Sequence, residues 1–461
     1  MKRVNIPFIS KNVEIELPDE TEVLSMQTPQ PLSNEAQAIQ QALDNPIQSL
    51  PLEQIVEAKK TKNPHPTAVI VISDNTRPVP YTSDNGILWP IIERLLHAGV
   101  NRRDICVLVA TGTHRAMHEQ ELREMIDERV FLHGIPVINH NCRDAANLSH
   151  LGSTKRGTKV LVNKSYLDAD IKILTGLVES HFMAGVSGGR KSVCPGLLGE
   201  EGTYVFHGAE MLASKNVRDL NITDNPVHEE ALEVAIMAGV DFIVNVTLDH
   251  AFKLTGVFAG HLVYAHEAAA RCLRDYVAIP LDKQYDIVIT HGGYVGLNHY
   301  QVGKVAVVAI QAVKQGGHLL VVGDNTDVDP VGSLNYKTVL YLLKLFGVEG
   351  FLRLIQSPDW MFIPEQWQVQ MWAKLFAQIP QEHFLYYSPQ FEQQHYRIIP
   401  GFNGNDLLSS ANQYTQSYDS MSKVIQYGVL RALKQLEEAG ISKPSMAYLA
   451  DGPYGIIVLD N

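Results

Sequence analysis

The pattern of apolar and polar positions divides the chain into short buried strands and amphipathic helices. Apolar runs bounded by polar residues or glycine predict strands over 67–74, 105–112, 170–176 and 241–248. Helical patterns separate several of these runs. Glycine readily adopts the left-handed conformation that closes a helix, and three helices end in an Ala-Gly pair, at 97–100, 237–240 and 438–441. This alternation predicts an α/β fold.

One helix carries signals at both of its ends. Asn225 is a favoured N-cap residue, Pro226 suits the first helical position, and Gly239 suits the stop. The segment between them therefore predicts a helix that packs on the sheet.

A second series of elements begins after residue 276. Its predicted strands span 285–292, 316–324, 383–389 and 445–451, and its predicted helices lie near 301–314, 364–378 and 421–439. We therefore expect two domains, 1–276 and 277–461, each with a mostly parallel sheet flanked by helices, and an active site in the cleft between them. Residues 389–420, rich in Gln, Asn, Ser and Tyr, predict an irregular connection. The tail 421–461 can belong to the second domain or pack back on the first.

Composition and charge exclude several classes of protein. The chain has 461 residues, of which 45% are hydrophobic, and a formal net charge of −12. Its basic residues are spread along the sequence, which argues against nucleic-acid binding and against a basic membrane patch. The four cysteines are far apart and form no Cys-x-x-Cys pair, so neither a disulfide framework nor a thiolate zinc site is expected. The N-terminus has no apolar signal core, and a cytoplasmic protein is predicted.

The stretch 185–192 resembles a Walker A loop without matching it. Gly185 is followed by four residues and then by Arg190, Lys191 and Ser192, so an arginine replaces the second glycine of the motif. The following Pro195 would also break the helix that such a loop must open. A kinase or ATPase is therefore not expected, and Lys191 needs another explanation.

Polar side chains gather directly after predicted strands, where open α/β sheets bind ligands. They are Asp74, Thr76 and Arg77, then His114, then His181, and in the second domain Tyr300, Gln301 and Lys304. Each also has an ordinary interpretation, since a single histidine at a loop is more often structural than catalytic.

Three of these segments together resemble one family. They are Asp-x-Thr-Arg-Pro at 74–78, Thr-Gly-Thr-His-Arg at 111–115, and His-x-x-x-Gly-x-Ser-Gly-Gly-Arg-Lys at 181–191. In this order they resemble the lactate racemase family of enzymes that depend on a nickel-pincer nucleotide. The resemblance covers nearly the whole chain.

The resemblance implies a covalently bound cofactor. Lys191 would form a thioamide with a nickel-carrying pyridinium-3-thioamide-5-thiocarboxylic acid mononucleotide, and His207 would be the protein ligand to nickel. Imidazole suits nickel, although His207 could instead only cap a helix near Gly208. The remaining implied cofactor-binding residues are Asp74, Thr76, Ser187, Gly188 and Gly189.

The resemblance also implies roles toward a substrate. His114 and His181 would be the acid/base pair, one for each enantiomer. Arg77 would clamp the substrate carboxylate, although an ion pair with Asp74 on the same turn is an alternative. Tyr300, Gln301 and Lys304 would add substrate contacts, Met183 would line the side-chain pocket, and Trp367 would close the pocket or merely pack.

The implied function is that of an isomerase, a racemase or epimerase of 2-hydroxy acids that works by reversible hydride transfer to the cofactor. A short-chain acid like lactate is favoured slightly over a longer polar acid such as malate or an aldonate. A non-catalytic cofactor-binding protein and a zinc hydrolase using His114, His181 and His207 are the competing hypotheses. The expected partners are a small 2-hydroxy acid and the enzymes that make the cofactor.

Overall fold

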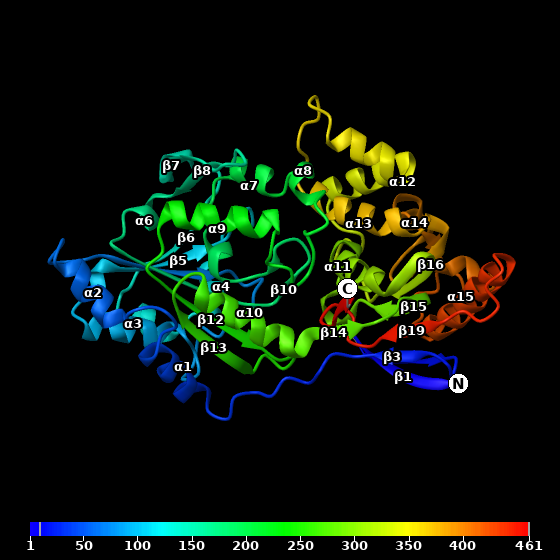
Figure 1. Cartoon of the computed structure of the whole chain (residues 1–461), viewed down its shortest axis with the longest axis horizontal. Helices are drawn as coiled ribbons and strands as arrows, with labels where there is room; N and C mark the ends of the chain where they lie inside the picture. Colours follow the sequence, from blue (N-terminus) through cyan, green and yellow to red (C-terminus); the bar gives the residue numbers. More distant parts are fainter. Residues whose placement is uncertain (9–10, 460–461) are drawn as a thin grey trace. The chain divides into compact units, whose positions relative to one another are not determined.

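The computed structural model describes residues 1–8 and 11–459 and divides into two compact units. One unit is Thr28–Tyr276, and the other combines Met1–Gln27 with Val277–Asn461. Both contain a six-stranded sheet covered by helices (Figure 1). The α/β class with two mainly parallel sheets, predicted from the sequence, is confirmed.

The sheet of the 28–276 unit has the strand order β13-β12-β9-β4-β5-β6. Neighbouring strands are parallel except for the edge pair β12 and β13. The strands are β4 (Ala68–Ser73), β5 (Ile105–Ala110), β6 (Val137–Asn139), β9 (Ile171–Leu177), β12 (Phe242–Leu248) and β13 (Leu254–Gly260). Four of them match the predicted apolar runs because strands buried on both faces contain few polar residues.

Helices cover both faces of this sheet, and Figure 1 shows α9 and α1 on opposite sides of it. The helices are α1 (Glu35–Asp44), α2 (Leu52–Lys60), α3 (Leu88–His97), α4 (Glu119–Met125), α5 (Glu128–Leu132), α6 (Lys164–Leu167), α7 (Glu200–Phe206), α8 (Ala209–Leu212), α9 (Pro226–Ala238) and α10 (Tyr264–Val277). Buried side chains of α1 to α3, including Ile39, Val56 and Ile91, pack with the strands in one core. Short hairpins β7–β8 (Leu148–Ser153, Lys159–Asn163) and β10–β11 (Ser180–His181, Gly185–Val186) complete the unit.

The predicted helix ends are confirmed. The Asn225 side chain accepts hydrogen bonds from the amides of Val227 and His228 at the start of α9, and Pro226 is its first residue. Gly99, Gly239 and Gly440 have φ values of 87°, 77° and 88°, as expected for glycines that end helices.

The sheet of the other unit has the order β18-β17-β16-β15-β19-β3, with all neighbours parallel. Its strands are β3 (Glu22–Leu24), β15 (Tyr285–His291), β16 (Val313–Val322), β17 (Phe384–Tyr387), β18 (Phe402–Asn403) and β19 (Met446–Leu449). Its helices are α11 (His299–Ala309), α12 (Leu334–Ile355), α13 (Gln366–Gln378), α14 (Gln393–Ile398) and α15 (Asp419–Glu438). The pair β14 (Ala278–Leu281) and β20 (Ile456–Leu459) forms a small parallel sheet.

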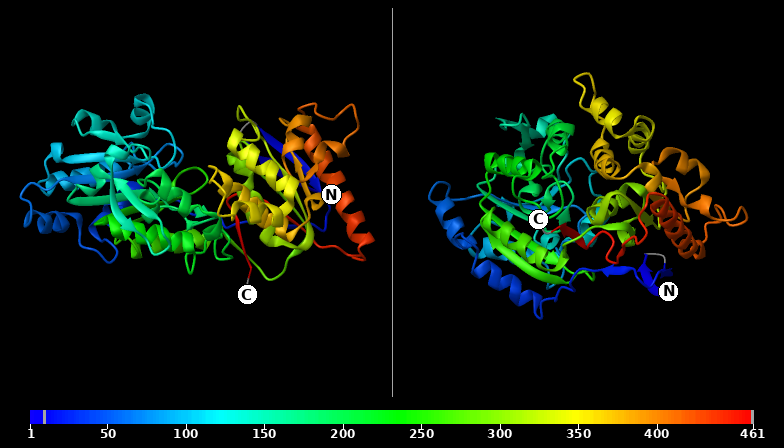
Figure 2. Two further views of the ribbon diagram at one scale, coloured as in Figure 1. Left: turned by 90° about the horizontal axis from the view of Figure 1, so that it is seen from above. Right: turned by 45° about the vertical axis from the view of Figure 1, so that its right-hand side comes forward.

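The N-terminal residues and the C-terminal tail pack with this second unit. Strand β3 pairs with β19, and the hairpin of β1 (Lys2–Pro7) and β2 (Asn12–Leu17) shares a hydrophobic core with α15. Figure 2 shows the blue hairpin beside the orange-red helix. The compact units meet in sequence at residues 276 and 277, but residues 1–27 group with the C-terminal unit rather than with 28–276.

The region 389–420 differs from the sequence-based expectation of an irregular connection. It contains the helix α14 and the short strand β18, which pairs with β17 at the edge of the sheet.

Within residues 1–8 and 11–459, no helix combines the length and the apolar character needed to cross a membrane.

Candidate active site

The candidate site lies at the carboxyl ends of β4, β5 and β9, which are adjacent in the sheet. From β4, the next strands along the chain, β5 and β6, are added toward one edge of the sheet. The later strands β9 and β12 are added toward the other edge. The strand order therefore reverses between β4 and β9, and open α/β sheets bind ligands at such a point.

The loops after β4 and β5 are joined by a hydrogen bond between Asp74 and His114. The Nδ1 atom of exposed His114 lies 2.7 Å from Oδ2 of buried Asp74. The Thr76 hydroxyl donates to the other carboxylate oxygen of Asp74 at 2.5 Å. Because a carboxylate accepts hydrogen bonds, Nδ1 of His114 carries the proton and Nε2 presents a lone pair.

Asp74 is held in its ionised form. Burial alone would raise the pKa of its carboxyl, but the hydrogen bonds from His114 and Thr76 outweigh burial, and the pKa lies below its usual value. Asp74 therefore accepts the Nδ1 hydrogen bond of His114 and orients its ring. These contacts involve both carboxylate oxygens of Asp74. They indicate that Asp74 and Thr76 orient His114. Cofactor binding by these two residues stays a prediction.

His181 has the opposite arrangement of its ring nitrogens. It ends β10, and its Nδ1 accepts hydrogen bonds from the amides of Met183 and Ala184, both at 3.2 Å. In the neutral ring the proton is therefore on Nε2. Met183 is 2% exposed, so its side chain is buried in the interior.

Arg77 pairs with Glu179 and not with Asp74. Its Nε lies 3.2 Å from Oε1 of Glu179, and the two side chains are 32% and 40% exposed. Asp74 is already engaged by His114 and Thr76. The ion pair joins the loop after β4 to the loop after β9.

The loop that carries Lys191 is a 3-10 turn over Gly189–Ser192, not the start of an α-helix. Gly188 and Gly189 open it with φ values of 74° and 50°. A Cβ at Gly188 would lie 2.8 Å from Val178 Cγ2, and one at Gly189 would lie 2.6 Å from the His266 ring. The two glycines are therefore required by close packing against the protein core, and the Walker A interpretation is excluded by the turn that follows them.

The Ser187 hydroxyl fixes the start of this loop. It donates to the carbonyl of Leu177 at 2.8 Å and accepts from the amide of Glu179 at 2.9 Å. The loop is thus bound to the end of β9. A contact of Ser187, Gly188 or Gly189 with a cofactor stays a prediction.

His207 follows α7 and lies within electrostatic reach of Lys191. Burial and the Lys191 ammonium lower the pKa of His207 to about 3. The imidazole is therefore neutral at physiological pH, which is the form that binds a metal ion. A lysine on a rigid loop and one neutral histidine beside it fit a lysine-tethered cofactor whose metal needs a single protein ligand.

The part of the chain that the structure describes contains no group of three or more His, Cys, Asp or Glu side chains arranged to hold a metal ion. The described side chains of His114, His181 and His207 thus form no three-histidine zinc site of the kind considered from the sequence.

The predicted substrate residues of the C-terminal unit lie on two neighbouring helices. Tyr300, Gln301 and Lys304 belong to α11, and Trp367 belongs to α13. The Trp367 indole donates to the Tyr300 hydroxyl at 3.1 Å, and burial raises the pKa of Tyr300 to about 12. The Tyr300 proton is therefore retained and can be donated to a ligand. Asn298, by contrast, caps α11 by accepting from the Gln301 amide.

Comparison with known proteins decides the family. The lactate racemase N-terminal domain family matches residues 8–219. A lactate racemase of Lactiplantibacillus plantarum is 30% identical over 383 residues, covering 82% of this chain and 87% of that protein. The chain belongs to the lactate racemase family. The resemblance inferred from the three motifs is confirmed.

A second relative and a solved structure that resembles this chain come from one species. A lactate racemase of Thermoanaerobacterium thermosaccharolyticum is 29% identical over 395 residues, covering 81% of this chain and 86% of that protein. The solved structure of the lactate racemase apoprotein from this organism matches with a TM-score of 0.81 at 23% identity, over 100% of both chains. This likeness shows a shared fold.

This member of the lactate racemase family has a buried arginine that sequence reasoning missed. Arg190, next to Lys191, is 1% exposed and contacts Nε2 of His228. Its Nε and Nη2 atoms have no hydrogen-bond partner among the described residues, and burial lowers the pKa of Arg190 to about 10. His266 closes the same cluster through its Nε2, 2.9 Å from the Ser187 carbonyl. Arg190 stands in the Gly-Gly-Arg-Lys segment noted above, but its burial and its contact with His228 could not be read from the local sequence.

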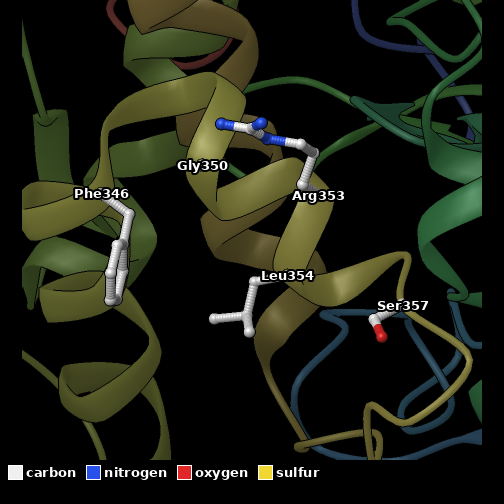
Figure 3. A pocket seen from close by; sticks show the side chains of 5 residues that line it. All are labelled: Phe346, Gly350, Arg353, Leu354 and Ser357. Carbon is white, nitrogen blue, oxygen red and sulfur yellow. The ribbon is translucent and has the colours of Figure 1, made fainter.

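A surface pocket elsewhere is unrelated to these residues. It is lined along and just after α12 by Phe346, Gly350, Arg353, Leu354 and Ser357 (Figure 3). None of the site residues predicted from the lactate racemase family lines it, so we do not regard it as part of the candidate active site.

The loop glycines give a first prediction, for Gly185→Ala. Gly185 has a φ of 80°, and a Cβ there would lie 2.2 Å from the backbone oxygen of Asn221. We expect a loss of about 3 kcal/mol in the free energy of unfolding, from the strained φ together with overpacking. The measurement is chemical denaturation of the purified variant.

Gly157→Ala is the matched control for this prediction. Gly157 has a φ of 88°, and a Cβ at this position would have no neighbour within 4 Å, so only the backbone strain of about 1 kcal/mol is expected. Equal losses in the two variants would show that close packing at Gly185 is unimportant.

Proposed function

We propose that this protein is a racemase or epimerase of 2-hydroxy acids that uses a nickel-pincer nucleotide tethered to Lys191. The observation that carries the proposal is the placement of His114, His181 and Arg77 in the loops around the reversal of strand order, next to the loop of Lys191. The names of the relatives support the reaction class. At identities of 30% and 29% to these relatives, membership of the family does not specify which 2-hydroxy acid is the substrate.

Lys191 and His207 would hold the cofactor. Lys191 would supply the amine of the thioamide, and His207 would supply one nitrogen ligand to nickel. When bound, such a cofactor provides a reversible acceptor for a hydride. This chemistry avoids removing a very weakly acidic proton from the carbon beside a carboxylate.

His114 would act as a base toward the substrate hydroxyl. Its Nε2 lone pair accepts the hydroxyl proton, and the ionised Asp74 at 2.7 Å from Nδ1 stabilises the resulting imidazolium. The carbonyl left at C2 is planar and can be reduced on either face. The same histidine returns a proton to the C2 oxygen in the reverse step.

His181 would serve the hydroxyl of the other enantiomer. Its neutral ring carries the proton on Nε2 and can donate a hydrogen bond to the C2 oxygen. To accept a proton at Nε2, the ring must first move its proton to Nδ1, which requires release of the two backbone amides that now bind Nδ1. A small rotation of His181 on substrate binding is therefore part of the proposal.

Arg77 would bind the substrate carboxylate with its planar guanidinium. Tyr300, Gln301, Lys304 and Trp367 remain predicted substrate contacts from the second unit. Since Asn298 is engaged as a helix cap, it is a poor candidate for binding a polar substrate tail. This observation supports the slight preference for a short-chain acid such as lactate over malate or an aldonate.

Replacement of either histidine is expected to reduce turnover in both directions. His114→Ala and His181→Ala should each lower kcat/KM by about 10²-fold or more, the usual effect of losing a positioned acid or base. Because the two enantiomers have equal free energy, the loss must be equal for both. Steady-state rates from each pure enantiomer measure it, and a variant with near-normal turnover would show that its histidine is structural.

A panel of single-enantiomer 2-hydroxy acids tests the proposed function. The cofactor-loaded protein is incubated with each acid, and the products are separated by chiral chromatography. Conversion of lactate or 2-hydroxybutyrate is the expected result. Conversion confined to malate or sugar acids would correct the substrate and keep the reaction, whereas no conversion of any acid would refute the function.

A further inference from the structure

The carboxylate of Glu179 lies where a substrate carboxylate is proposed to bind. Its Oε1 is 3.2 Å from Nε of Arg77, and both side chains are partly exposed. Arg77 also makes a long contact of 3.4 Å from Nη1 to the Thr76 carbonyl. Glu179 is therefore the resident counter-ion of the proposed clamp.

The backbone of Glu179 is fixed on both sides. Its amide donates to the Ser187 hydroxyl at 2.9 Å, and its carbonyl accepts from the Ser187 amide at 2.9 Å. It also lies two residues before His181 in the sequence. The backbone that carries the Glu179 side chain is thus bound to the loop that carries Lys191, and the ion pair with Arg77 places the carboxylate.

Asp74 has other partners than Arg77. Its two carboxylate oxygens accept hydrogen bonds from His114 and Thr76. The carboxylate that forms an ion pair with Arg77 is that of Glu179.

We propose that Glu179 sets the charge selectivity of the site, so that the preferred substrates are 2-hydroxy acids with a single carboxylate. The proposal rests on the proposed function and on Arg77 as the clamp. A substrate carboxylate must compete with Glu179 for the guanidinium. A second carboxylate on the same small acid would lie near Glu179, and exposed charges interact over about one Debye length, about 8 Å at physiological ionic strength. Such an acid is repelled.

The test compares Glu179→Gln with the wild-type enzyme on lactate and on malate. The substitution keeps the shape and removes the charge. We expect KM for lactate to fall about two- to fivefold, the value of a partly exposed ion pair, with kcat within about twofold. The kcat/KM for malate should rise about tenfold, because a like-charge repulsion also disappears.

Glu229→Gln is the matched control. Glu229 pairs with Arg156 in the same unit, with side-chain exposures of 42% and 38% against 40% and 32% for Glu179 and Arg77. Its partner Arg156 lies in the β7–β8 hairpin, which carries none of the site residues named above, so both kinetic ratios should be unchanged. Glu179→Asp, which keeps the charge, should keep the selectivity against malate.

The salt dependence of the wild-type enzyme gives a second measurement that needs no variant. The preference for lactate over malate should decrease as salt increases, since screening weakens the repulsion. Unchanged selectivity in Glu179→Gln, or a preference that does not respond to salt, would overturn the inference and leave the proposed function intact. A wild-type enzyme inactive on every 2-hydroxy acid would instead refute the proposed function.

Discussion

Lys191→Ala is expected to abolish both the covalent mass increase and all racemisation. Without an amine at this position the thioamide cannot form, and the turn Gly189–Ser192 contains no second lysine. The measurement is the intact mass of protein co-produced with the cofactor-making enzymes, together with turnover of a single-enantiomer 2-hydroxy acid.

Two further variants make this result specific. Lys191→Arg keeps the positive charge beside His207 but cannot form a tether, because a guanidinium stays protonated. It should behave like Lys191→Ala. Lys215→Ala, at an exposed lysine of the same unit, should retain the full adduct. An unchanged adduct in Lys191→Ala would place the tether elsewhere.

His207→Ala should retain the covalent organic group and lose nickel. The protein contributes one nitrogen to the metal in this account, so its removal leaves no protein ligand. The loss of nickel affinity should exceed the about 10- to 100-fold typical of residues that only support a ligand. Metal analysis of the purified, mass-checked protein measures it.

The exposed His150 provides the control for this variant. His150→Ala should keep both the organic group and the nickel. If His207→Ala binds nickel as tightly as the wild type, His207 is only the residue that ends α7, and the assignment of the ligand is wrong.

The central strands of both sheets were predictable because they are buried on both faces. β4 and β5 are nearly continuous apolar runs, and β9 is apolar apart from Lys172, Thr175 and Gly176. Such runs are recognisable without knowing their neighbours. β3 could not be predicted in the same way. It has three residues and is defined by its pairing with β19, which lies at the other end of the chain, and local sequence does not contain that contact.

The candidate site was predictable as a set of residues but not as a set of contacts. The motifs identified His114, His181, Arg77 and Lys191 through the family resemblance. The partners of these residues depend on strand order, since Asp74 meets His114 only because β4 and β5 are adjacent. For the same reason the local sequence does not predict the ion pair of Glu179 with Arg77, which depends on β9 lying beside β4.

The most direct test of the account is racemisation of one pure enantiomer of lactate by the loaded enzyme in D2O. The product enantiomer is separated by chiral chromatography, and its mass is measured. Reversible hydride transfer, with His114 and His181 handling only the hydroxyl proton, predicts an opposite enantiomer that keeps the original hydrogen at C2. An opposite enantiomer with deuterium at C2, or no opposite enantiomer from any 2-hydroxy acid, would contradict the account.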